Sequence, residues 1–225
     1  MNRVKTAFVA IIMAMSFASL AWTQGMRGGM GRQAPRLLGE FKPVVGSGAQ
    51  YQMTTQNRTS SFSYAIVGKE DAEGGIGYWM EIRSQSAEMN GEMVMKQLLV
   101  VSGDKPQIKR MIMQMAGRPP MEMPVGMMQG MAHRGGGGSG DTSPGERVGS
   151  ETITVPAGTF DCEHYRKQEP SGTTVDVWVS SKVSPYGTVK MTSGEMTMVL
   201  EKILTDEKSH IQGEPQKMNI PFPRQ

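Results

Sequence analysis

Cysteine and histidine are scarce in this chain of 225 residues, which contains one cysteine, Cys162, and three histidines. A single thiol cannot form an internal disulfide, so packing must stabilise the fold. The common catalytic motifs are also missing: there is no Gly-x-Ser-x-Gly, no His-Glu-x-x-His and no Cys-x-x-Cys. We therefore expect no enzyme activity and no cofactor.

Cys162 and His164 are the nearest approach to a catalytic pair. They are two residues apart, so on a strand both side chains would lie on one face, as a nucleophile and its base would. The sequence shows no orienting group or oxyanion site beside them. A buried apolar cysteine and a half-buried structural histidine are therefore the favoured interpretation, although an intermolecular disulfide or a reactive thiol stays open.

A large excess of charge of one sign is lacking as well. The chain has 24 basic and 21 acidic residues, a net charge of +3. Removal of Arg3 and Lys5 with the N-terminal segment lowers this to +1, so the pI of about 9.0 is no sign of an anionic partner. We expect no nucleic-acid binding.

The N-terminal segment has the three parts of a cleavable secretory signal peptide. Arg3 and Lys5 precede an apolar run over residues 7–20, and Ser19-Leu20-Ala21 places small residues at a cleavage site. The apolar run is shorter than the ~20 residues of a transmembrane helix. We expect export to the periplasm or the outside, with no transmembrane segment after cleavage.

Composition divides the rest of the chain. We expect a signal peptide over 1–21, a disordered Gly-, Met- and Arg-rich leader over 22–36, a single β domain over 37–206 with a flexible Gly-rich loop at 133–147, and an extended tail over 207–225.

Apolar residues recur with a period of two through most of the domain. Examples are Phe62, Tyr64 and Ile66, and then Val175, Val177 and Val179. This alternation is typical of strands with one buried and one wet face, and no helical repeats separate the runs. The sequence predicts a mainly β fold of about eight or nine strands, a curved antiparallel sheet whose strands form a meander that curls on itself.

One segment departs from this period. Pro119-Pro120 ends a strand, and Pro124 stands where a first helical residue would. Met123, Met127 and Met131 then recur every four residues, which is the spacing of one helix face. We expect one or two short helices that cover the sheet.

Methionine is unusually abundant: 22 residues, of which 11 lie between Met89 and Met131. Thioether side chains are unbranched and polarizable and suit adaptable apolar surfaces. They could simply be core, or they could line a concavity that binds a lipid or another apolar ligand. The candidate lining residues are Met80, Met93, Met95, Met111, Met113, Met115, Met196 and Met198.

Copper is the alternative ligand, because soft thioethers suit Cu(I). The metal candidates are Met121, Met123, Met127, Met128, Met131 and His133. The spacing discriminates poorly, since Met-x-Met on a strand also points both side chains to one apolar side. A third alternative is a structural or interaction module of the cell envelope with a fully packed core; no protein partner can be named.

Three segments around two turns carry a resemblance. Val155–Arg166 reads VPAGTFDCEHYR, Val175–Ser180 reads VDVWVS and Val183–Lys190 reads VSPYGTVK. This pattern resembles a group of uncharacterised exported bacterial proteins, which are similar in layout to the lipoprotein-carrier (LolA/LolB-like) half-barrels. The resemblance covers roughly residues 148–204. It implies an incomplete barrel whose apolar concavity binds acyl chains and is covered by short helices.

Overall fold

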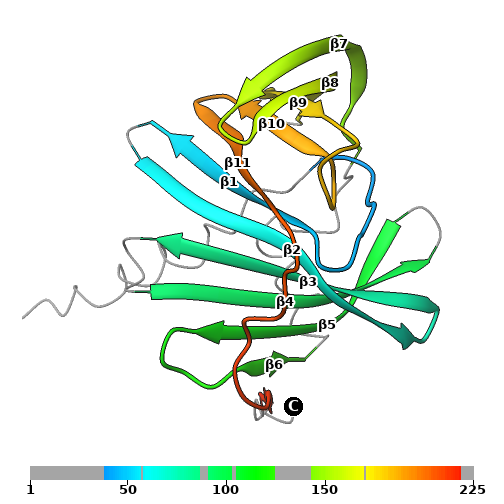
Figure 1. Cartoon of the computed structure of the whole chain (residues 1–225), viewed down its shortest axis with the longest axis vertical. Coiled ribbons are helices and arrows are strands. Elements are labelled where there is room, and N and C mark those ends of the chain that lie inside the picture. The colour runs from blue at the N-terminus through cyan, green and yellow to red at the C-terminus, as the bar shows by residue number, and fades with distance from the viewer. Residues whose placement is uncertain are drawn as a thin grey trace, which may run out of the picture. The chain divides into compact units, whose positions relative to one another are not determined.

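Two runs of consecutive antiparallel strands build the fold, shown in Figure 1. The computed structural model describes residues 38–56, 58–86, 91–102, 105–124, 143–169 and 171–218. These residues contain no α-helix, and all belong to one compact unit, Ala34–Gln225.

The first run holds β1 (Gly48–Thr55), β2 (Arg58–Ala72), β3 (Gly75–Ser86), β4 (Gly91–Ser102), β5 (Lys105–Met115) and β6 (Met121–Met123). The second run holds β7 (Glu146–Val155), β8 (Gly158–Gln168), β9 (Thr174–Val179), β10 (Thr188–Ser193) and β11 (Met196–Leu204). A last strand, β12 (Gln216–Lys217), pairs in parallel with β6.

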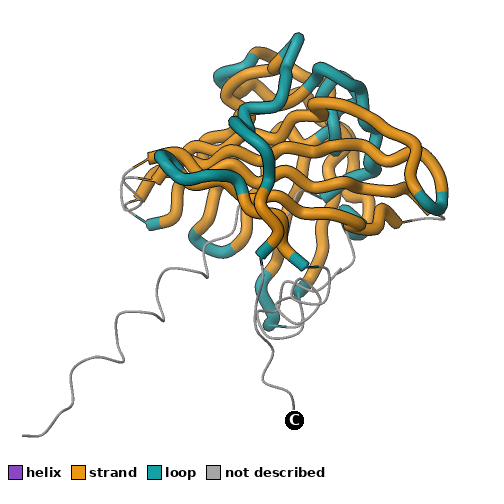
Figure 2. The backbone as a smooth tube through the Cα atoms, turned by 90° about the horizontal axis from the view of Figure 1, so that it is seen from below, coloured by secondary structure: helices purple, strands orange, loops and turns teal. Residues whose placement is uncertain are grey.

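The two runs join through β1 and β11, which pair over their whole lengths. The result is one 12-stranded sheet in the order β12-β6-β5-β4-β3-β2-β1-β11-β10-β9-β8-β7. Its edge strands do not pair with each other, so the barrel stays open, while β7 contacts β10 and β11 because this end of the sheet curls strongly. Figure 2 shows that strands make up most of the described backbone. The predicted mainly β, curved antiparallel sheet is confirmed.

Sequence patterning undercounted the strands. The described residues contain twelve strands instead of eight or nine; two of those not counted, β6 and β12, have only three and two residues and show no alternation. Met123 was expected on a helix face but is the last residue of β6; the rest of the expected helix lies outside the described residues. The ladder between β7 and β8 begins at Glu146, so the last two residues of the expected loop at 133–147 belong to a strand.

Two turns identified in the sequence fix the register of the strands that they join, and each turn depends on a glycine. Gly158 begins β8 after the Pro156-Ala157 turn with a φ of +133°. Gly187 precedes β10 with a φ of +77°, and a Cβ there would lie 2.6 Å from Val179 Cγ1 and 3.0 Å from the carbonyl oxygen of Ser180. A side chain at position 187 would therefore clash with the end of β9.

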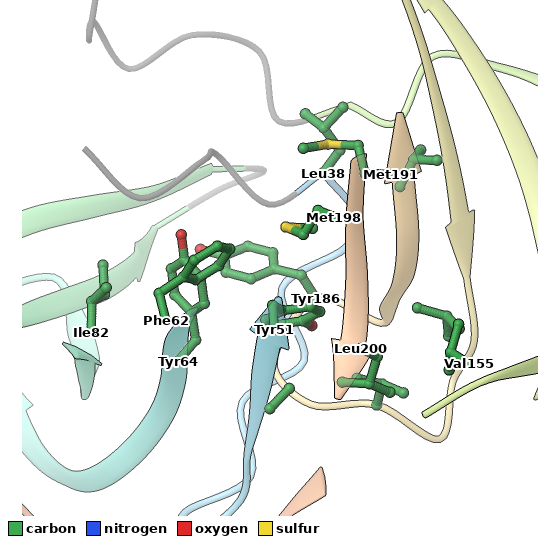
Figure 3. Packing of buried hydrophobic residues seen from close by; sticks show 14 of the residues in the cluster. Leu38, Tyr51, Phe62, Tyr64, Ile82, Val155, Tyr186, Met191, Met198 and Leu200 are labelled. Carbon is green, nitrogen blue, oxygen red and sulfur yellow. The ribbon is translucent and has the colours of Figure 1, made fainter. Parts of the chain in front are cut away.

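The main core draws on both runs of strands and is shown in Figure 3. The Tyr51 and Phe62 rings stack at 5.7 Å, and the Tyr51 hydroxyl donates a hydrogen bond of 2.9 Å to the carbonyl of Thr188. Met198 and Leu200 of β11 pack in the same cluster. Burial of such side chains stabilises the fold by ~25 cal/mol per Å² of apolar area. We call the sheet face that carries Tyr51, Phe62 and Met198 the core face.

The opposite face of β2–β5 has a smaller cluster of its own. Trp79, Leu98 and Ile112 are buried there, and Ile211 of the C-terminal segment packs against them. In Figure 1 this segment runs from the end of β11 across the sheet to β6. We call this side the tail face and residues 205–215 the strap.

Candidate functional site

Seven methionines of β4, β5 and β6 lie on the core face as a continuous cross-strand ladder. Antiparallel partners directly opposite each other project to the same side of a sheet. The pairs are Met93 with Met115, Met95 with Met113, Met113 with Met121, and Met111 with Met123. Met95 lies opposite Ile82 of β3, which belongs to the main core, so this side is the core face.

Exposure varies along this methionine ladder. Met123 is buried, with 7% of its surface exposed, whereas Met121 is 37% and Met115 is 45% exposed. Met93, Met95, Met111 and Met113 are half-buried. Of these four, only Met95 packs against the main core formed by the described residues. The ladder is therefore packed only in part against the main core, and the rest of it forms an apolar surface beside that core.

The other methionines predicted to line a concavity have different places. Met80 and Met198 are buried in the main core, and Met196 is half-buried against it. These three also lie on the core face. Met80 is directly opposite Ile66, and Met196 is directly opposite Thr55, and residues directly opposite each other project to the same side of the sheet. Sequence patterning thus identified one shared face, but it could not separate core methionines from accessible ones.

Two polar groups stand on the core face beside the ladder. Gln97 is buried opposite Met80 and Met111, and its Nε2 donates to the Met95 sulfur at 3.4 Å. Ser84 is paired with Met93, and its Oγ is buried without a hydrogen-bond partner among the described residues. Buried hydroxyls almost always have a partner, so this unpaired one calls for an explanation.

Among the metal candidates, Met121 and Met123 belong to the ladder. Met127, Met128, Met131 and His133 lie outside the described residues. Within the described ranges no group of three His, Cys, Asp or Glu side chains could hold a metal ion.

Cys162 and His164 do not form a nucleophile and base. The Cys162 thiol is buried in the main core and points to the carbonyl of Phe160 at 3.6 Å. Burial, with the nearby Asp161 and Glu151 carboxylates, raises its pKa to about 11. His164 instead lies 2.6 Å from Asp176 and 3.3 Å from Glu151, and its ring stacks on Trp178 at 4.5 Å. Both ring nitrogens are thus engaged by carboxylates.

A cleft of about 870 Å³ opens elsewhere, at the sheet end where β9 ends and β10 begins. Its lining includes Phe41, Val44, Tyr186 and Ile203, with Lys42 and Lys182 among the polar residues. Burial raises the pKa of Tyr186 to about 12, so this hydroxyl stays protonated at neutral pH. None of the eight methionines predicted to line a concavity lines this cleft.

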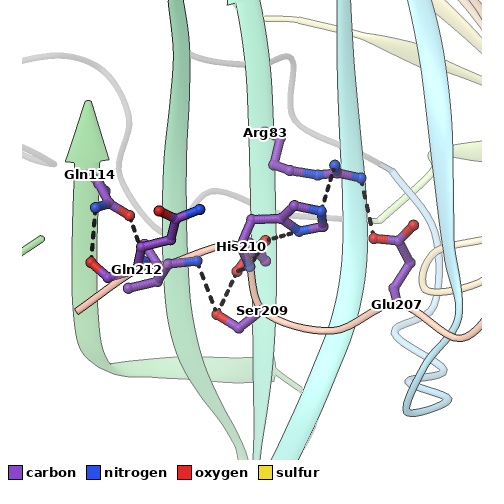
Figure 4. Close-up of polar contacts among 8 residues, drawn as sticks. Arg83, Gln114, Glu207, Ser209, His210 and Gln212 are labelled. Atoms are coloured by element: carbon purple, nitrogen blue, oxygen red, sulfur yellow. Dashed lines mark hydrogen bonds and ion pairs between the residues drawn. The ribbon is translucent and has the colours of Figure 1, made fainter. Parts of the chain in front are cut away.

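The tail face carries a buried carboxylate that sequence reasoning missed. Glu81 is buried on β3 and accepts hydrogen bonds from Ser209 Oγ at 2.8 Å and from the His210 backbone N–H at 3.0 Å. Figure 4 shows these contacts, the Arg83–Glu207 ion pair at 3.2 Å and the Gln114–Gln212 contacts. In the sequence, Glu81 simply occupies the wet face of an alternating strand, so only the strap's position reveals its role.

Comparison with known proteins finds similar solved structures at low sequence identity. No family model and no curated protein matches the chain. A Bacteroides fragilis protein described as exported, with a YmcC-like fold, is 15% identical; the match covers 74% of this chain and 99% of that one, with a TM-score of 0.37.

Two further solved structures are similar at the same level. A Parabacteroides distasonis protein described as a lipoprotein is 13% identical over 74% of this chain and 99% of that one, with a TM-score of 0.38. A β-barrel-like protein of a domain of unknown function from Brucella abortus is 11% identical over 73% of this chain and 99% of that one, with a TM-score of 0.23. None of the three is described as a lipoprotein carrier, and similarity at this level carries no argument about activity.

The fold and the ladder together define a class: an open antiparallel β-barrel-like domain with a methionine-rich face.

The described part of the chain has no helix with the length and hydropathy of a membrane span.

Proposed function

We propose that this chain is an exported, non-enzymatic protein that binds a lipid or another apolar ligand on its methionine ladder. Export rests on the signal-peptide pattern of residues 1–21. The observation that carries the binding proposal is the half-buried state of Met93, Met111 and Met113, which pack in neither core cluster of the described residues.

The chemistry of this surface fits a ligand with an apolar body and one polar end. Ligand sites are mostly apolar with a few placed polar groups that orient the ligand. Flexible thioethers adapt to an acyl chain of variable shape. The unpaired Ser84 hydroxyl beside Met93 supplies the polar contact. The cleft lined by Phe41 and Tyr186 is a less suitable site, because lysines and serines interrupt its apolar lining.

Native mass spectrometry of protein purified from its own source tests for bound lipid, and titration with a fluorescent fatty acid measures uptake. Met113→Glu places a charge at the centre of the ladder and should lower fatty-acid affinity at least about tenfold, a loss of ~1.4 kcal/mol. Val148→Glu is the matched control, since Val148 is 52% exposed on β7, at the other edge of the sheet from the ladder. Absence of both lipid and uptake, or equal losses in the two variants, would overturn the proposal.

Ser84→Ala separates a ligand contact from a structural role. Removal of an unpaired buried hydroxyl should leave the stability of the unliganded protein unchanged or raise it by up to about 1 kcal/mol. The same change should weaken fatty-acid binding several-fold. Lower stability with unchanged binding would show that the hydroxyl serves the fold.

A further inference from the structure

The register of the ladder brings three thioether side chains into one row across neighbouring strands. Met95 lies directly opposite Met113, and Met113 lies directly opposite Met121. Residues directly opposite on antiparallel strands have Cβ atoms about 4.5–5.5 Å apart. A methionine side chain has three rotatable bonds, so the sulfurs of such a row can converge on one small cation without backbone movement.

The row combines residues from strands whose pairing cannot be read from the sequence. Met95 is 18 residues before Met113 and belongs to none of the Met-rich tracts after residue 110. Only the β4–β5 pairing places it beside Met113. The Gln97 amide, which donates to the Met95 sulfur at 3.4 Å, restrains that side chain and leaves the second sulfur lone pair available.

The donor set selects the kind of ion. Thioether ligands are soft and uncharged, so they favour Cu(I) over hard or strongly hydrated divalent ions. In the described ranges, no group of three His, Cys, Asp or Glu side chains is arranged to hold a metal ion. Met121 is 37% exposed, which gives an ion access to the row from solvent.

We propose that Met95, Met113 and Met121 form a binding site for a soft monovalent cation, Cu(I), with Ag(I) as its redox-inert analogue. The site is independent of the apolar-ligand proposal, because it rests on sulfur donors in register rather than on apolar area. It differs from the sequence-based copper tract by including Met95 of β4 and needing no residue beyond Met121.

Leucine substitution is the test, since it keeps size and apolarity while removing the sulfur. The full chain is titrated with Cu(I), under anaerobic reducing conditions, against a colorimetric Cu(I) chelator. Each of Met95→Leu, Met113→Leu and Met121→Leu should weaken Cu(I) binding by at least about tenfold, and the triple variant should lose it. Met80→Leu and Met198→Leu, both buried in the main core, should leave Cu(I) affinity unchanged.

A second measurement locates the ion. Ag(I) should shift the methyl NMR signals of Met95, Met113 and Met121, and Zn(II) should not. Fatty-acid uptake should be unchanged in the triple leucine variant, because leucine keeps the size and apolarity of the side chains. Failure of the metal site can therefore be told apart from failure of the apolar-ligand proposal. Full Cu(I) affinity in the triple variant, or no Cu(I) binding by the wild-type chain, would overturn the metal site.

Discussion

At the scale of single residues, burial decides the chemistry of the few reactive groups. Cys162 lies in the main core with its pKa raised to about 11, which keeps the thiol neutral and unreactive at physiological pH. Burial likewise raises the pKa of Tyr51, and burial with neighbouring tyrosines raises that of Tyr64. These groups are structural in the folded state.

The free energy of unfolding should therefore fall at alkaline pH. The unfolded thiol ionises near its ordinary pKa of 9.0, while the folded thiol keeps its proton to about pH 11. Ionisation of the unfolded state lowers stability between these values by up to about 1.4 kcal/mol per pH unit. Above pH 10 the buried tyrosines act in the same direction. Urea unfolding at pH 8, 9 and 10 measures the decline.

Cys162→Ala supplies the comparison for this pH dependence. The variant should show a smaller loss of stability between pH 9 and 10 than the wild-type chain, whatever its stability at pH 8. Parallel pH profiles for the two proteins would contradict the assignment of this effect to the thiol.

At the scale of elements, the strap is the segment whose position depends on a few polar contacts. Glu81 of β3 accepts hydrogen bonds from Ser209 and His210, and Ile211 then covers Trp79, Leu98 and Ile112. Backbone contacts at both ends hold the segment, from Glu207 to Gly46 and from Gln216 to Pro120. The strap thus seals an apolar cluster that would otherwise face solvent.

Glu81→Gln should destabilise the protein by about 1.5–3 kcal/mol, because it weakens charge-assisted hydrogen bonds to a buried carboxylate. Urea unfolding measures the change, and faster proteolytic cutting within 205–218 should accompany it. Glu195→Gln is the matched control in the exposed β10–β11 turn, where the effect should stay within about 0.5 kcal/mol. Equal stability of the two variants would show that the carboxylate does not hold the strap.

At the scale of the described fold, the two runs of strands share one core. The main cluster combines Phe62 and Ile66 from the first run with Val177 and Leu200 from the second. The β1–β11 pairing joins the runs by backbone hydrogen bonds as well. Neither run can bury its apolar face alone, so we expect the two to unfold together.

Single-tryptophan variants test this cooperativity. Trp79 lies on β3 of the first run and Trp178 on β9 of the second. With the other two tryptophans replaced by phenylalanine, the fluorescence of either residue should report the same urea midpoint as the far-UV circular dichroism of that variant. A fluorescence midpoint separated from the circular dichroism midpoint in either variant would show that the runs unfold independently.

The sequence by itself determined the class of the fold and the sharing of one face by the strand methionines. Both follow from the period of two, a local property that requires no knowledge of partners. It could not count β6 and β12, because strands of three and two residues exist only through pairing with neighbours. Nor could it show the β1–β11 junction, which pairs residues about 150 positions apart.

Only the tertiary structure decided which methionines are core and which are accessible. Met198 and Met113 have the same local pattern, yet β11 lies in the middle of the sheet over the main core and β5 lies near its edge. Burial depends on what packs against a face, and that is set by strand order rather than by alternation. The same reason explains Glu81, whose role depends on Ser209 of the strap, 128 positions away in the sequence.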